Sequence, residues 1–223
     1  MSREIRSLRN DAAAWYSGVL DEVTAALPSS IDRARQILEP IAGEVWMGSL
    51  TLHGVTTAGS GARTSRRVSD RTRAEVFLRD GFLCTYCGGR TIPRCILVAI
   101  SDVFPDEFSY YAHYRRGTVH PAYWALAPEA DHVLAHAGGG SSDPANLTTL
   151  HAMCNTRKSS LAADSLPLVA ATPARDSEWD GLLSRYADIV TIGETAGRRH
   201  ASPDYHSSWL RRFGRRADDI RLN

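Results

Sequence analysis

Two pairs of potential metal ligands, far apart in the chain, restrict its fold more than any other feature. Cys84 and Cys87 are separated by two residues and are followed by two glycines. His151 and Cys154 repeat the two-residue spacing downstream. Three thiolates and one imidazole make a normal tetrahedral shell for structural zinc, and the glycines allow a tight turn at the first pair. The sequence therefore predicts one Zn²⁺ site that ties the two segments together and leaves no position open for water.

Cys95 is the alternative to His151 as the fourth zinc ligand, because it lies close to the first pair in the sequence. It is followed by the apolar run Ile96–Ile100, which predicts a buried strand. A lone cysteine in such a run is more often a small core residue than a ligand. With three cysteines on the metal, no disulfide framework is needed, and a reducing, cytoplasmic location is expected.

Polar residues of a different kind surround the downstream ligand pair. They are an acid, a base, two amides and a lysine: Asp131, His132, Asn146, Asn155 and Lys158. An imidazole with a pKa near ~6.5 can take a proton from water at neutral pH. A carboxylate and a neutral amide oxygen suit Mg²⁺ or Mn²⁺ better than zinc. The set therefore contains what hydrolysis of a phosphodiester bond requires, namely an activated water, a cation and positive charge beside the phosphate.

In their order along the chain, these motifs resemble the HNH endonuclease family: Cys-x-x-Cys, then Asp-His, then Asn-Leu, then Cys-Asn-x-x-Lys. The resemblance covers roughly residues 69–160. It implies an α+β fold whose centre is a ββα-metal core stapled by the structural zinc. His151 is a departure from the pattern, because the family usually has a cysteine at that position.

The resemblance also implies a role for each of the polar residues. Asp131 and Asn155 would hold the catalytic cation, Mg²⁺ or Mn²⁺. His132 would be the general base that activates water. Asn146 would order the loop and orient this base, and Lys158 would face the phosphate and stabilise its developing charge.

The implied activity is hydrolysis of DNA by a metal-dependent endonuclease that leaves a 5′-phosphate. Restriction or defence against foreign DNA is the expected setting. Two alternatives stay open on the sequence alone. One is a zinc-stabilised module that binds nucleic acid without cutting it, and the other is a nuclease that acts on RNA or degrades nucleic acid unspecifically.

The formal net charge is +1, so the position of the basic residues matters more than their sum. Residues 63–94 hold eight arginines against three acidic residues, which predicts a basic surface for phosphate contacts. A solvated helix face is the alternative. Arg67 and Arg71 in this run, and Arg157 near the downstream zinc ligands, are the predicted DNA contacts. A second basic cluster at 211–216 either contacts DNA or flanks a short amphipathic helix.

The N-terminal portion, residues 1–58, is expected to be mostly helical. Apolar residues recur at helical spacing over 8–27, and a second helix is expected from Ile31 past Leu38. Residues 47–55 alternate loosely like a strand. This element is expected to pack on the core or to form a homodimer.

The core, residues 69–160, is expected to begin with a capped helix from Ser69 to Asp80 that ends at Gly81. It is expected to carry an aromatic-rich insertion at about 96–128. The insertion either covers the core as a small hydrophobic satellite, which is the preferred interpretation, or stacks on bases. Residues 161–223 are expected to be a linker and a C-terminal accessory segment. No run of about eighteen apolar residues and no apolar signal segment is recognised, so association with a membrane is not expected.

Overall fold

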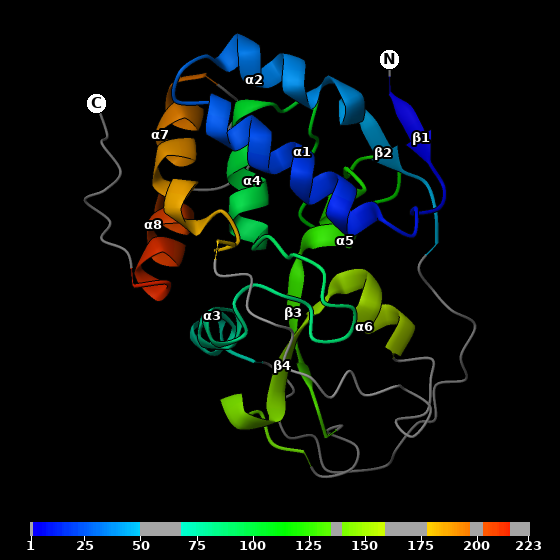
Figure 1. The fold of residues 1–223 in the computed structure, drawn as a ribbon, viewed down its shortest axis with the longest axis vertical. Helices are drawn as coiled ribbons and strands as arrows, with labels where there is room; N and C mark the ends of the chain where they lie inside the picture. The colour runs from blue at the N-terminus through cyan, green and yellow to red at the C-terminus, as the bar shows by residue number, and fades with distance from the viewer. Residues whose placement is uncertain (1, 50–67, 135–139, 159–177, 197–202, 215–223) are drawn as a thin grey trace.

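The computed structural model describes residues 2–49, 68–134, 140–158, 178–196 and 203–214. Within these ranges the chain forms helices and two small two-stranded sheets (Figure 1). The expected mixed α+β class is therefore confirmed. Short 3-10 turns connect some of the elements, at Glu39–Ile41, Pro144–Asn146 and Leu183–Arg185.

Two helices of the N-terminal portion lie across one end of the molecule (Figure 1). They are α1 (Ala12–Ala26) and α2 (Ile31–Leu38). The Ser30 hydroxyl accepts a hydrogen bond from the backbone N–H of Arg33 at 3.2 Å, at the point where α2 begins. A serine there satisfies an N–H group that has no partner within the helix. Both predicted helices are confirmed, although α1 begins later than the apolar spacing suggested.

The prediction of a strand over 47–55 is wrong for residues 47–49, which form no strand. Residues 50–55 are outside the described residues. The chain forms its strand just before, as β2 (Glu44–Trp46), which pairs in parallel with β1 (Arg3–Ile5). Pairing with β1 decides this position, because a three-residue strand needs a partner more than it needs an alternating pattern.

α4 (Arg94–Val103) corrects the prediction of a strand over Ile96–Ile100. Every residue of this helix after the first is buried, and α7 (Tyr186–Ala196) and α8 (Pro203–Arg212) pack against it. A segment that is buried on every side carries no amphipathic period. Its sequence therefore does not separate a buried helix from a buried strand.

The aromatic-rich insertion packs mostly inside the molecule, and it includes a second short helix, α5 (Ala122–Leu126). Phe104, Phe108 and Tyr123 are fully buried. The ring centroids of Phe108 and Tyr123 lie 5.4 Å apart. Because these three rings are enclosed, they cannot stack on bases, which supports the satellite interpretation for this part of the insertion.

A buried polar network joins α4, α7 and α8. His206 on α8 lies 3.1 Å from Asp102 Oδ2 on α4 through its Nε2, and 2.8 Å from Tyr186 OH on α7 through its Nδ1. All three residues are buried. Buried polar groups must be hydrogen-bonded, so this network restricts how the three helices meet.

An antiparallel hairpin and the helix after it lie at the other end of the molecule from α1 and α2 and carry the polar residues singled out above (Figure 1). β3 (Pro128–His132) pairs with β4 (Leu147–His151), and α6 (Ala152–Lys158) follows without a gap. α3 (Asp70–Arg79) also packs against both strands. The hairpin is therefore held between two helices.

α3 has the boundaries that its sequence predicted. The Ser69 side chain accepts a hydrogen bond from the backbone N–H of Thr72 at 3.1 Å, which caps the first turn. Gly81 follows the helix with φ +63°, in the left-handed region that favours glycine at a helix end. These two signals are local, which is why the sequence was sufficient to place this helix.

Candidate metal centre and active site

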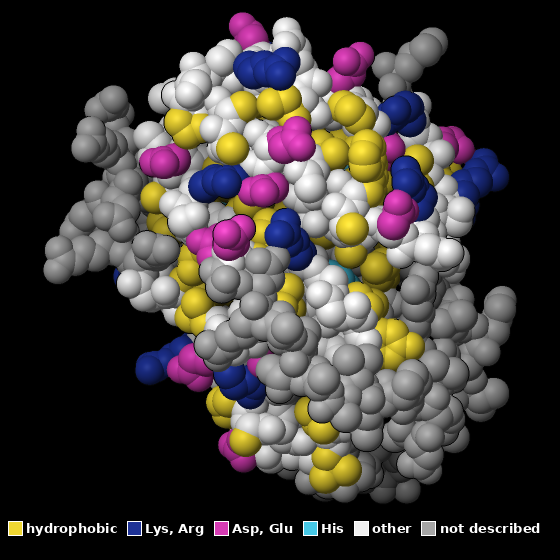
Figure 2. Space-filling view, viewed as in Figure 1, with side chains coloured by type: hydrophobic (Ala, Val, Ile, Leu, Met, Phe, Trp, Pro, Cys, Tyr) yellow, Lys and Arg dark blue, Asp and Glu magenta, His cyan; other side chains and the backbone are white. Residues whose placement is uncertain are grey.

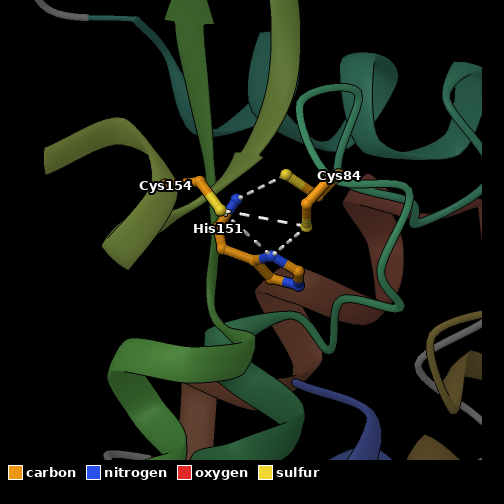
Figure 3. A group of neighbouring side chains, drawn as sticks. Cys84, His151 and Cys154 are labelled. Atoms are coloured by element: carbon orange, nitrogen blue, oxygen red, sulfur yellow. Dashed lines mark hydrogen bonds between the residues drawn. The ribbon is translucent and has the colours of Figure 1, made fainter. Parts of the chain in front are cut away.

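Four side chains from the two predicted ligand pairs meet at one point. The ligand atoms of Cys84, Cys87, His151 and Cys154 all lie within 4.8 Å of one another. Figure 3 shows Cys84 on a turn that faces His151 and Cys154, which stand at the junction of β4 and α6. The described residues hold no second group of this kind. The two-residue spacings therefore predicted a cluster that could bind zinc.

The distances within this cluster match a tetrahedral zinc shell. Cys154 Sγ lies 3.8 Å from Cys87 Sγ and 3.7 Å from His151 Nδ1. Cys87 Sγ lies 3.4 Å from His151 Nδ1. Tetrahedral bonds of about 2.3 Å to sulfur and about 2.0–2.1 Å to nitrogen place neighbouring ligand atoms roughly 3.5–3.8 Å apart. The residues present therefore fit Zn²⁺ without rearrangement.

The ring of His151 is already turned for metal binding. Its Nε2 donates a hydrogen bond to the Arg90 carbonyl oxygen at 2.9 Å. Nε2 therefore carries the proton, and Nδ1 directs its lone pair at the sulfur atoms, the arrangement that metal-binding histidines use. Hydrogen bonds from Cys154 and Cys87 lower the pKa of the Cys84 thiol far below its ordinary value. The thiolate, which is the form that binds metal, is thus favoured at Cys84, whereas hydrogen bonds with Cys84 and Cys87 raise the pKa of Cys154.

The turn that carries the first two ligands depends on its two glycines. Gly88 has φ +72°, which strains other residues. A Cβ atom on Gly89 would lie 3.0 Å from His151 Cε1 and 3.3 Å from Cys87 Sγ. A larger residue at position 89 would therefore press on two of the four ligands.

Asp131 and His132 are the last two residues of β3, so their side chains leave opposite faces of the strand. His132 is half-buried. Its Nε2 lies 3.2 Å from the Ser142 hydroxyl, which belongs to the loop before β4. The ring is therefore in polar contact at the edge of the hairpin, rather than turned inward against apolar side chains.

Asn155 reaches from α6 to the strand that carries Asp131. Its Nδ2 donates a hydrogen bond to Glu129 Oε2 at 2.6 Å. Glu129 and Asp131 are two residues apart in β3, so their side chains leave the same face. The bond holds the amide against this face and leaves Oδ1 as the atom that can act as a metal ligand.

Asn146 closes the loop between the two strands. Its side chain accepts a hydrogen bond from the Leu134 N–H at 2.9 Å and donates to the carbonyl oxygens of Leu134 and Ser141, at 3.1 and 2.8 Å. A Cβ atom on Gly140 would clash with the Leu134 carbonyl and lie 2.8 Å from Asn146 Nδ2. This geometry suits a scaffolding residue, while the orientation of His132 by Asn146 stays a prediction.

The predicted DNA contacts are placed only in part. Arg71 is exposed on α3 and pairs with Glu75 at 3.2 Å. Arg67 lies outside the described residues, and so do the side chains of Arg157 and Lys158. Their roles stay predictions.

Described arginines from the two basic clusters of the sequence lie side by side in the structure. Arg71 and Glu75 of α3 line a surface hollow of about 600 Å³ together with Arg211 and Arg212 of α8. Over α1 and α2, by contrast, Figure 2 shows basic and acidic side chains interspersed. Concentrated arginines suit phosphate contacts better than a mixed surface does. Among the described residues, no helix has both the length and the apolar character needed to cross a membrane.

The hairpin, its loop and α6, which carry Asp131, His132, Asn146 and Asn155, coincide with a match to a known family. Residues 125–161 match the HNH endonuclease family. The predicted resemblance is confirmed over this HNH segment. Members of the family are generally nucleases that use divalent metals, which supports a hydrolase acting on nucleic acid. No match to the chain was found among curated proteins or among solved structures.

The HNH segment contains the downstream zinc ligands, and the cluster geometry joins them to Cys84 and Cys87 outside the matched range. Cys95 is not part of the cluster. It is buried in α4, and burial raises the pKa of its thiol to about 12. A neutral, enclosed thiol is a core residue, so the preference for His151 over Cys95 is supported.

Two residues, Glu129 inside the HNH segment and Arg94 outside it, were missed at the sequence level. Glu129 precedes Asp131 by two positions, and alternation along the strand could have indicated it as a neighbour on the same face. Arg94 was counted only as one arginine among eight. Its position at the start of α4 follows from a helix that the sequence did not predict.

Proposed function

We propose that this chain is a metal-dependent HNH endonuclease that hydrolyses phosphodiester bonds of DNA and leaves a 5′-phosphate. The observation that carries the proposal is the family match over residues 125–161, which falls on consecutive strand, strand and helix elements. This order corresponds to the ββα-metal core that the resemblance implies. Restriction of foreign DNA, or a related defence process in the cytoplasm, is the proposed setting.

His132 would be the general base that takes a proton from the attacking water. The contact between its Nε2 and the Ser142 hydroxyl at 3.2 Å restrains the ring at the end of β3. Asn146 would keep the adjoining loop in place through its three side-chain hydrogen bonds. A positioned general base typically contributes about 10²–10⁴-fold to the rate.

Asp131 and Asn155 would hold Mg²⁺ or Mn²⁺, because a carboxylate and an amide oxygen are ligands that hard cations prefer. The bound cation would supply charge stabilisation at the phosphate and at the departing 3′ oxygen. Glu129 restrains the amide of Asn155 from the side opposite its ligand atom. Lys158 is proposed to face the phosphate.

The cluster of three cysteines and His151 would hold Zn²⁺ in a structural role, because protein ligands fill all four positions. Cys154 and Asn155 are adjacent at the start of α6. Zinc at Cys154 would therefore fix the helix turn from which the proposed cation ligand projects.

DNA is the proposed partner, and the hollow lined by Arg71, Arg211 and Arg212 is the proposed phosphate-binding surface. Arg67 and Arg157 are proposed to extend it. Cutting of both strands by one active site requires either two successive nicks or two subunits, so a homodimer is also proposed.

The experiment that tests this function compares three proteins on supercoiled plasmid with Mn²⁺. They are the unmodified chain, His132→Ala, and the matched control His113→Ala, whose histidine is exposed outside the HNH segment. We expect His132→Ala to cut at least about 10²-fold more slowly, because the general base is lost. His113→Ala should cut like the unmodified chain. End-labelling of the products checks for the 5′-phosphate.

Equal cutting by the unmodified chain and His132→Ala would sink the proposed mechanism. Binding without cutting would favour the non-catalytic module instead. Duplex DNA, single-stranded DNA and RNA are compared under the same conditions, and faster hydrolysis of RNA would replace DNA as the proposed substrate.

A further inference from the structure

A cavity of about 440 Å³ lies beside the proposed catalytic residues. Its wall includes Glu129 and Asn155 from the HNH segment and Arg94 from the first position of α4. Pockets of about 300–1,000 Å³ are typical of sites for small ligands. The roles proposed above leave this cavity unexplained.

Arg94 is a cation that no carboxylate of the described residues pairs with directly, although Glu129 shares its cavity wall. Its Nε atom is buried and has no hydrogen-bond partner, and its guanidinium forms no ion pair with any described residue. The guanidinium carbon lies 4.9 Å from the centre of the Tyr114 ring. Arginine stays charged at physiological pH, and a buried charge without a counterion is costly. A protein can carry this free-energy cost at a site where a bound ligand supplies the anion.

Positive potential in the cavity has two further sources. Arg73 of α3 lines the wall, and its pairing with Asp70 is loose, at 3.7 Å. The N-terminus of α4 adds the positive end of a helix dipole. The wall also holds two carboxylates: Asp70 lies between Arg73 and Arg212, at 3.7 and 3.8 Å, and Glu129 accepts a hydrogen bond from the Asn155 amide on the side of the HNH segment. An anionic group is therefore the ligand that fits beside Arg94.

The remaining wall is largely aromatic. Tyr110, Tyr205 and Trp209 line the cavity, and each is partly buried. Proteins bind the bases of unpaired nucleic acid on aromatic side chains and the adjoining backbone on basic ones. A guanidinium also suits phosphate, because its parallel N–H groups can bond two oxygens at once.

We propose that this cavity binds one nucleotide of the nucleic-acid substrate, with the phosphate at Arg94 and Arg73 and the base against the aromatic wall. The substrate class rests on the function proposed above. A nucleotide in the cavity has left the base stack, so the enzyme should favour substrates with an unpaired or mismatched nucleotide near the cut.

Isothermal titration of the full-length, zinc-loaded protein tests the cavity directly. The probes are deoxynucleoside monophosphates, inorganic phosphate and deoxynucleosides, with no other divalent cation added. We expect a monophosphate to bind at least about tenfold more tightly than phosphate or nucleoside alone, because it uses both walls. Arg94→Met should weaken this binding at least about tenfold, since a charge-assisted hydrogen bond is lost.

The melting temperature adds a readout that separates ligand binding from a structural role. Arg94→Met keeps the apolar stem of the side chain, so its Tm should stay close to that of the unmodified chain while nucleotide binding is weakened. The matched control is Arg33→Met, whose arginine is exposed on α2 and does not line the cavity. It should change neither the binding nor the Tm. If Arg94→Met does not fold, Arg73→Met replaces it, because that side chain is 42% exposed.

Monophosphate binding by Arg94→Met equal to that of the unmodified chain would overturn the inference, and so would an affinity no greater than that of phosphate. The same titrations on His132→Ala keep the two proposals apart. If His132→Ala still binds the monophosphate but no longer cuts DNA, both the cavity proposal and the proposed nuclease function are supported. If Arg94→Met still cuts DNA and none of the proteins binds the nucleotide, the cavity proposal fails while the proposed nuclease function stands.

Discussion

Asn155 shows how one hydrogen bond decides which atom of a side chain is available. An amide has a donor end and an acceptor end. Glu129 accepts from the donor end at 2.6 Å, which leaves the acceptor end for the proposed cation. Without this carboxylate the amide could turn over, because its oxygen and nitrogen occupy nearly the same space. Glu129 is therefore a positioning residue that acts through Asn155.

Replacement of Glu129 by alanine should raise the Mn²⁺ concentration needed for half-maximal cutting by about 10–100-fold, as expected when the partner of a metal ligand is lost. The rate at saturating Mn²⁺ should stay close to that of the unmodified chain, because His132 is unaffected. Metal titrations of plasmid cutting measure both quantities. Glu129→Gln retains an acceptor oxygen and should show a smaller shift. A lower saturating rate with an unchanged metal requirement would contradict the positioning role.

Residues whose roles follow from local spacing were accessible to sequence reasoning, and those whose roles follow from distant contacts were not. Cys84 and Cys87 could be paired with His151 and Cys154 because two intervening residues suit one tetrahedral ion. The bond between Glu129 and Asn155 depends on where α6 lies relative to β3. No local pattern contains that placement.

At the scale of elements, the ends of helices were better predicted than the identity of buried segments. α2 and α3 have serine caps that mark where each begins. α4 has no such cap, and its continuous apolar run fits either a helix or a strand. Packing against α7 and α8 resolves the ambiguity, and this information is distant in the sequence.

Loss of one zinc ligand should affect the elements that the cluster joins. Cys84→Ser should purify with much less than one equivalent of zinc, whereas the matched cysteine control Cys95→Ala should retain one equivalent. Structural zinc contributes on the order of 10 kcal/mol to the folding of small modules. The turn at Cys84 should therefore detach from the β4–α6 junction, and the cooperative unfolding transition should be lost. Atomic absorption and circular dichroism measure the two effects.

The opposite pattern, with zinc lost from Cys95→Ala and kept in Cys84→Ser, would replace His151 by Cys95 in the ligand set. Cys95→Ala itself leaves a small cavity in α4 and should lower the Tm only modestly. The comparison therefore separates metal binding from core packing.

At the scale of the whole molecule, the three portions distinguished in the sequence contribute to one hydrophobic core. Its buried members include Leu20 of α1, Ile100 of α4 and Leu210 of α8. Apolar spacing predicted a face to bury in the N-terminal portion, and aromatic residues predicted one in the insertion. They could not predict that these faces meet one another, because the pairing of faces is a property of the folded chain.

His120 is one of the points where the N-terminal portion meets the insertion. It is fully buried, its Nε2 donates to the Ile41 carbonyl at 2.8 Å, and its Nδ1 accepts from the Ala122 N–H at 3.1 Å. Burial lowers the pKa of this histidine to about 3. The ring is therefore neutral in the folded protein at any pH above this value, with both nitrogens engaged in joining the two portions.

Acid should weaken the folded state through this residue. In the unfolded chain the imidazole gains a proton below pH ~6.5, whereas in the folded chain it stays neutral down to about 3. The stability that neutral His120 contributes is thus complete above pH ~6.5 and is lost as the pH falls, by about 2 kcal/mol at pH 5.

The Tm should therefore drop by about 4–8 °C between pH 7.5 and 5 because of this group. Burial raises the pKa of the nearby Glu44, which makes acid stabilise the folded state through that carboxyl group in all three proteins compared below. His120→Gln should therefore be less stable at pH 7.5 but lose less on acidification, while the exposed His113→Gln should follow the unmodified chain. If the Tm of all three proteins falls by the same amount between pH 7.5 and 5, His120 is not the group that causes the loss of stability in acid.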